Sequence, residues 1–114
     1  MLMTDAAAVE AGHAILDPIA AEYLERPEVD IGAMFGSEGL RVRGKVFAFL
    51  NHLGALVIKV PEAGADAIVA AGDGERMEMR GRVAREWVVV DQGRAVRWAP
   101  LMADAFAYLD EITP

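Results

Sequence analysis

Cysteine is absent from the 114 residues of this chain. Its absence excludes disulfides, thiol catalysis, cysteine zinc sites and iron–sulfur clusters. Hydroxyl nucleophiles are scarce too: Ser37 is the single serine and lies in the glycine-rich stretch GSEG, where a turn-forming role explains it. The threonines, Thr4 and Thr113, lie near the two ends. No nucleophile, base and orienting group can be named together, so we expect no enzymatic activity and no cofactor.

Long apolar runs are also missing, because no uncharged stretch approaches the roughly 20 residues that cross a bilayer. The first ten residues carry Asp5 and Glu10 where a secretory signal carries lysine or arginine. We therefore expect a cytoplasmic protein without membrane association. The length allows one domain over residues 1–114, with residues 1–4 frayed.

Basic residues are in the minority, with eleven against eighteen acidic residues and a net charge of −7. This balance opposes nonspecific attraction to nucleic acid or anionic lipid. The charge is unevenly distributed, because residues 1–38 contain eight acids and one base, whereas residues 39–60 contain four bases and no acid. The predicted helices therefore carry the negative charge and the predicted strands carry the positive charge.

Three segments favour helix. Residues 5–16 are rich in alanine, and Thr4 or Asp5 can cap their start. Asp17-Pro18 predicts an interruption and a fresh turn to about residue 25, hence a kinked or two-piece helix. Pro61 begins a short helix that ends at Gly72. The last helix is expected over residues 99–112, with its apolar residues on one side.

Glycine punctuates residues 29–60 and predicts a meander of strands. Residues 40–43 alternate between apolar and basic, whereas residues 46–50 and 56–60 are apolar on both faces, as central strands are. Two more strands are expected over residues 76–80 and 86–90. The order predicts an α+β domain, with an antiparallel sheet of about five to six strands packed by an N-terminal, a short middle and a C-terminal helix.

The stretch GAMFGSEGLRVRGKVFAFL, residues 32–50, resembles the TfoX/Sxy N-terminal-domain-like family of small bacterial proteins. The matching positions are Met34, Phe35, Gly36, Gly39, Leu40, Gly44, Lys45, Phe47 and Ala48. Arg43 stands where the family more usually has an acidic residue. The resemblance extends over roughly residues 17–112. It implies an α+β fold with helices on an antiparallel sheet, and a relationship to the N-terminal half of a competence regulator.

Three apparent ligand motifs have simpler explanations. Gly39, Gly44 and Lys45 have the spacing of a phosphate-binding loop, but Val46 stands where that loop needs serine or threonine, and no helix follows. We interpret the glycines as hairpin residues. Glu10, His13 and Asp17 can share a helical face, yet such a face is more often solvated, and we predict no metal site. His52 is expected on the surface.

Arginines on the predicted strands are the most informative feature. If Leu40, Val42, Met77 and Met79 face the helices, then Arg41, Arg43, Arg76 and Arg80 face away from them, together with half of the two apolar strands. A sheet face that mixes aliphatic residues with arginine resembles an interface, and it has too few aromatic residues for a base-stacking platform. The candidate binding residues are Arg41, Arg43, Lys59, Arg76 and Arg80.

These observations favour a non-enzymatic interaction or regulatory module that forms a homodimer or binds an acidic protein partner through the sheet. The alternative is an anion or nucleic-acid binder that uses the same arginines, which the net charge disfavours. We further expect one core that contains Trp87, Phe35, Phe106 and Leu109, whereas Trp98 packs at the start of the last helix.

Overall fold

The computed structural model describes residues 4–34 and 37–114. The helices are α1 (Ala6–Leu24), α2 (Glu62–Ala70) and α3 (Trp98–Ile112), and a 3-10 helix, η1 (Gln92–Arg97), leads into α3. The strands are β1 (Val29–Met34), β2 (Ser37–Val42), β3 (Lys45–Leu50), β4 (Leu56–Lys59), β5 (Glu75–Met79) and β6 (Arg82–Val90). This α+β arrangement confirms the expected fold class.

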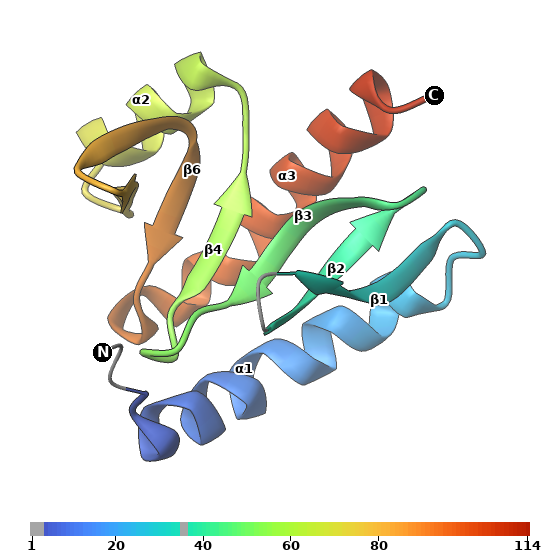
Figure 1. The fold of residues 1–114 in the computed structure, drawn as a ribbon, viewed down its shortest axis with the longest axis horizontal. Coiled ribbons are helices and arrows are strands. Elements are labelled where there is room, and N and C mark those ends of the chain that lie inside the picture. The colour runs from blue at the N-terminus through green and yellow to red at the C-terminus, as the bar shows by residue number, and fades with distance from the viewer. Residues whose placement is uncertain (1–3, 35–36) are drawn as a thin grey trace.

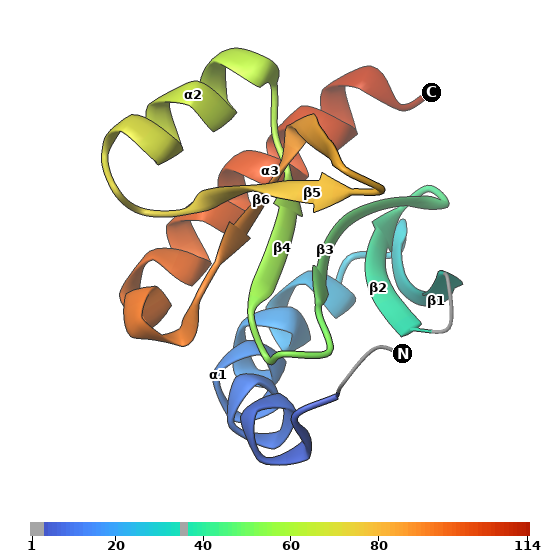
Figure 2. The ribbon, with the colours of Figure 1, turned by 60° about the vertical axis from the view of Figure 1, so that its left-hand side comes forward.

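The six strands form one antiparallel sheet in the order β1-β2-β3-β4-β6-β5 (Figure 1, with β5 labelled in Figure 2). The strands that are apolar on both faces, β3 and β4, occupy its centre, as their sequences predicted. β5 and β1 form the two edges. The sheet is strongly twisted, as Figure 2 shows from the side of β5.

All three helices contribute to one core on the same face of the sheet. A row of cross-strand partners marks this face: Ile31, Leu40, Ala48, Ile58, Val88 and Arg76. Leu16 and Ala20 of α1, Ile68 of α2 and Leu101 of α3 belong to the cluster that covers it. The opposite face, which we call the helix-free face, has no helix of the described chain packed on it.

A β-bulge brings an additional aromatic ring into this core. Leu40 pairs with Ala48 and Arg41 pairs with Val46, so Phe47 has no partner on β2. Phe47 therefore lies on the same side as Ala48 and is fully buried. Its ring lies 5.4 Å from Phe106 and 5.5 Å from Tyr23, between centroids, in a three-ring cluster.

The N-terminal helix is not in two pieces, one of the two forms that Asp17-Pro18 predicts, because α1 continues through Pro18. Pro18 and Ala14, whose carbonyl loses its usual helical donor, are both exposed, so water can satisfy that oxygen. Leu16 and Ala20, on either side of the proline, both pack into the core and hold the helix together. At its start the expected cap is confirmed: the Asp5 carboxylate accepts a hydrogen bond from the Ala8 backbone N–H at 3.0 Å.

The burial of the two tryptophans is the reverse of what the sequence predicted. Phe106 and Leu109 are buried as expected, and Phe35 lies outside the described residues. Trp98 is fully buried, whereas Trp87 is partly exposed on the helix-free face. The assignment of Trp87 to the core is therefore wrong, because Val88, its neighbour along β6, is the residue that faces the helices.

The predicted face of β5 is also wrong. Arg76 pairs in register with the buried Val88, and it forms an ion pair with Asp66 of α2, so it lies on the helix side. Met77 is only partly buried and Met79 is exposed. A one-residue difference in register exchanges the two faces of a strand, and alternation within β5 cannot fix that register.

Candidate functional site

The helix-free face has an apolar centre. A second row of cross-strand partners crosses it: Gly32, Gly39, Phe49, Val57, Val89 and Glu75. Lys59 and Trp87 face each other one step further along β4 and β6. Phe49, Trp87 and Val89 are each partly exposed, so apolar side chains reach the surface at the middle of the sheet.

Phe49 and Trp87 meet across β4. Their ring centroids are 5.8 Å apart and the planes are inclined by 62°, an edge-to-face contact. Val57, directly opposite Phe49, is only 1% exposed although no helix covers this face. The two rings therefore shield β4 while their outer surfaces remain in water. The sequence predicted too few aromatic residues here for a base-stacking platform, and the structure places an edge-to-face aromatic pair at the centre of the face.

Arg41 lies flat at one side of the helix-free face. Its guanidinium donates two hydrogen bonds to the Asp30 carboxylate, at 2.8 and 2.7 Å. A side chain at Gly32 would overlap Arg41, so the glycine makes room for the arginine to lie across β1. The hydrogen bonds from Arg41 hold the pKa of the Asp30 carboxyl below its usual value.

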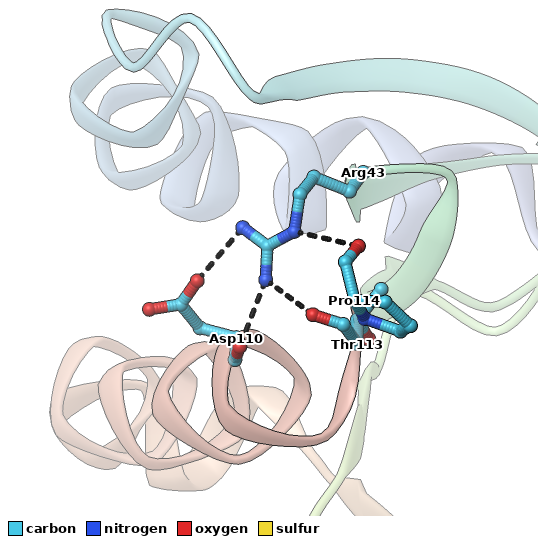
Figure 3. A network of polar contacts seen from close by, with 4 residues as sticks. All are labelled: Arg43, Asp110, Thr113 and Pro114. Atoms are coloured by element: carbon cyan, nitrogen blue, oxygen red, sulfur yellow. Dashed lines mark hydrogen bonds and ion pairs between the residues drawn. The ribbon is translucent and has the colours of Figure 1, made fainter.

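Arg43 does not lie on a sheet face, contrary to expectation. It occupies the β2–β3 turn, where its positive φ of 47° directs it to the end of α3. Its guanidinium donates to the Asp110 carboxylate at 2.9 Å and to the carbonyl oxygens of Asp110, Thr113 and Pro114 (Figure 3). Cations stabilise helix C-termini, so Arg43 serves as a clamp for α3.

The five candidate cations are not brought together. Arg41 and Lys59 lie on the helix-free face, Arg43 caps α3, and Arg76 contacts α2. Arg80 lies in the β5–β6 turn with φ of 52° and is exposed. Four of the five have a carboxylate partner within 4.0 Å, and no such partner is found for Arg80 among the described residues.

Glu86 links the edge of the helix-free face to α3. One of its carboxylate oxygens lies 3.9 Å from Lys59 Nζ, and the other accepts a hydrogen bond from the Tyr108 hydroxyl at 2.6 Å. The Lys59 ammonium also lies 5.7 Å from the centre of the Trp87 ring, in cation–π distance. The hydrogen bond to Glu86 raises the pKa of Tyr108, because it favours the protonated hydroxyl.

Both tyrosines are expected to ionise above pH 10.0 in the folded protein. Desolvation by burial raises the pKa of Tyr23, and the Glu86 hydrogen bond raises that of Tyr108. A pKa that is higher in the folded state gives stability that is present below pH 10.0 and is lost as the pH rises through the folded pKa. Absorbance at the tyrosinate band, measured against pH with and without denaturant, gives the titration midpoints of the unfolded and folded states. Equal midpoints in the two states would contradict the expected rise in pKa. Glu86→Gln should lower only the Tyr108 midpoint.

The residues of the family resemblance have structural positions where the structure describes them. Gly39 lies in β2, Gly44 takes φ of 86° in the hairpin turn, and Lys45 begins β3. These glycines therefore form a strand and a hairpin, as interpreted. Met34 ends β1, whereas Phe35 and Gly36 lie outside the described residues.

His13 and Asp17 form a surface pair on α1, with His13 Nδ1 3.0 Å from Asp17 Oδ1. Among residues 4–34 and 37–114, no three histidine or acidic residues lie close enough to hold a metal ion. Within the same residues, no helix is long and apolar enough to cross a membrane.

Comparisons of the chain with protein-family models, with curated proteins and with solved structures found no match. The assignment of the helix-free face therefore depends on its own geometry. Sequence reasoning missed Phe49 and Trp87 as surface residues because both strands are apolar on two faces. The charge of Lys59, which lies opposite Trp87, could have indicated that this face of β4 is in contact with water.

Proposed function

We propose that the protein is a non-enzymatic interaction module that binds a second copy of itself through the helix-free face. The observation that carries this proposal is the pair of partly exposed rings, Phe49 and Trp87, at the centre of that face. Aromatic residues surrounded by polar groups are typical of the energetic centres of protein interfaces. Contact with a partner would remove the remaining ring surface from water.

A second copy fits this face by its charges. Asp30, Arg41, Lys59 and Glu75 border the apolar centre, and their formal charges cancel. The whole chain carries −7, so two copies repel each other over most of their surfaces and least over this one. A twofold axis through the centre would place each patch against its own copy, as isologous interfaces require.

The resemblance of residues 32–50 to the N-terminal half of a competence regulator adds support for a regulatory role of the module.

The alternative, nucleic-acid binding, has one observation in its favour, since Phe49, Trp87, Arg41 and Lys59 could together contact a single strand. Two observations oppose it. Arg41 and Lys59 already have carboxylate partners, Asp30 and Glu86, so phosphates would have to displace them. The two rings also contact each other edge to face, which leaves no pair of parallel surfaces for stacking.

Tryptophan fluorescence tests the proposal, because the chain contains only two tryptophans. Trp98→Phe leaves Trp87 as the reporter, and Trp87→Phe leaves the buried Trp98. We expect iodide quenching of Trp87 to fall as the protein concentration rises through the micromolar range, while the Trp98 reporter stays protected throughout.

Two results would overturn self-association. Quenching of Trp87 that is independent of concentration up to about 1 mM would contradict it, given that about 1 mM is the weak limit of ordinary specific binding. Protection of Trp87 by a random single-stranded oligonucleotide, with an affinity that falls steeply with salt, would favour the nucleic-acid alternative instead.

A further inference from the structure

A cavity of about 330 Å³ lies between α1 and the strands β1, β2 and β3. Its α1 wall consists of His13, Leu16, Asp17 and Ala20, whose spacing places them on one side of the helix. Ile31, residues 37–40 and residues 48–50 complete it. The volume lies at the lower end of the range for small-molecule sites.

The cavity exists because α1 does not cover the β1 end of the row of cross-strand partners on the helix side of the sheet. Ile31, Leu40 and Ala48 are neighbours in that row, yet Ile31 is 49% exposed while Leu40 is 4% exposed. Ala20 and Ala48, which line the cavity from opposite sides, have side chains too short to fill the space between helix and strands. Ile31 is therefore the apolar lining residue that is most accessible from outside.

The rim of the cavity is acidic. Asp17 on α1 and Glu38 on β2 both line it and are both exposed. His13 lies beside Asp17 and contacts one of its carboxylate oxygens, Oδ1, at 3.0 Å. None of the described lining residues is a lysine or arginine. The carboxylates at the rim thus favour a ligand with a positively charged group, and the apolar lining favours a ligand that also has an apolar group.

We infer that this cavity binds a small organic cation, namely a primary amine attached to an aryl or short alkyl group. The ammonium group would lie at the rim between the carboxylates of Asp17 and Glu38. The apolar group would cover Ile31, which is 49% exposed, and bury surface that is now in contact with water. The site lies on the side of the sheet that α1 covers, although two of its lining residues, Gly39 and Phe49, also belong to the helix-free face. The inference does not depend on self-association.

The probe for this site is 2-phenylethylamine, compared with the neutral 2-phenylethanol of similar shape. Both are titrated into the ¹⁵N-labelled full chain at constant pH and salt, and backbone amide shifts are followed. We expect saturable shifts of residues in 13–20, 37–40 and 48–50, with the amine bound about fivefold more tightly, as one exposed ion pair allows.

Charge variants decide whether the rim recognises the ammonium group. Asp17→Asn and Glu38→Gln are expected to weaken amine binding severalfold and to leave binding of the alcohol unchanged. Glu22→Gln, which makes the same charge change on α1 at an exposed residue outside the cavity, should leave both affinities unchanged.

Three outcomes would overturn the inference. Equal affinity of the amine and the alcohol would show that the carboxylates at the rim do not contribute to binding of the ammonium group. Shifts that do not saturate, or that map to other parts of the chain, would show that the cavity is not the site. A loss of amine affinity in Glu22→Gln as large as in Asp17→Asn would reduce the effect to the overall charge of the protein.

Discussion

Replacement of Trp98 by alanine is expected to lower the free energy of unfolding by about 3 to 5 kcal/mol, the range for truncation of a large buried aromatic residue. Trp98 is fully buried, and its indole N–H donates a hydrogen bond to the carbonyl of Asp91 at 3.1 Å. The side chain therefore fixes η1 against the first turn of α3. Urea unfolding followed by circular dichroism measures the change.

Trp87→Ala is the matched comparison for this prediction. Trp87 is partly exposed, so its truncation should cost clearly less, about 1 to 2 kcal/mol. The order of the two losses matters more than either value. A larger loss for Trp87 than for Trp98 would place the core on the wrong side of β6 and contradict the fold described above.

Gly54→Ala is expected to cost about 2 to 4 kcal/mol, because two penalties add. Gly54 has φ of 78°, which side chains rarely adopt, and an added Cβ would overlap the backbone carbonyl of Ala8. The same junction holds Gln92, whose amide donates to the carbonyl oxygens of Ala8 at 2.7 Å and Gly54 at 2.9 Å. The substitution would push α1 away from the β3–β4 turn.

Gly72→Ala separates the two penalties. Gly72 has nearly the same φ, 76°, but no atom lies within 4 Å of an added Cβ. Its substitution should cost only the conformational penalty, about 1 to 2 kcal/mol. The difference between the two alanine variants in chemical denaturation measures the steric term. Equal losses at both positions would show that the close approach of Gly54 to α1 has no energetic weight.

The fold class, the order of elements and the central place of β3 and β4 could be predicted from local patterns. Alternation, glycine turns and two-sided apolar runs are properties of neighbouring residues, so the sequence contains them. The continuity of α1 through Pro18 was not predictable in this way, because the packing of Leu16 and Ala20 on distant strands decides it. The η1 turn, which Trp98 stabilises, likewise depends on a tertiary contact.

The candidate site was predictable only in outline. Arg41 was placed on the outer face from the alternation of its own strand, and the structure agrees. For Lys59 the strand left both faces open, and the structure puts it on the same outer face. Arg76 was misplaced because its orientation depends on the register with β6, which β5 alone does not specify. The bulge at Phe47 then allows Phe47 and Phe49 to point to opposite faces, although strict alternation would place them together.

Sedimentation equilibrium of the full chain tests the central claim, that the helix-free face is an interface between two copies, most directly. The wild-type mass should rise with concentration toward twice the monomer mass of 12.3 kDa. Trp87→Lys should weaken association by about 2 kcal/mol or more, roughly thirtyfold, as loss of a central aromatic anchor does. Val96→Lys, which changes an apolar residue that is 88% exposed elsewhere, should associate like the wild type. A mass of 12.3 kDa at every concentration, or equal weakening by both lysine variants, would contradict the account.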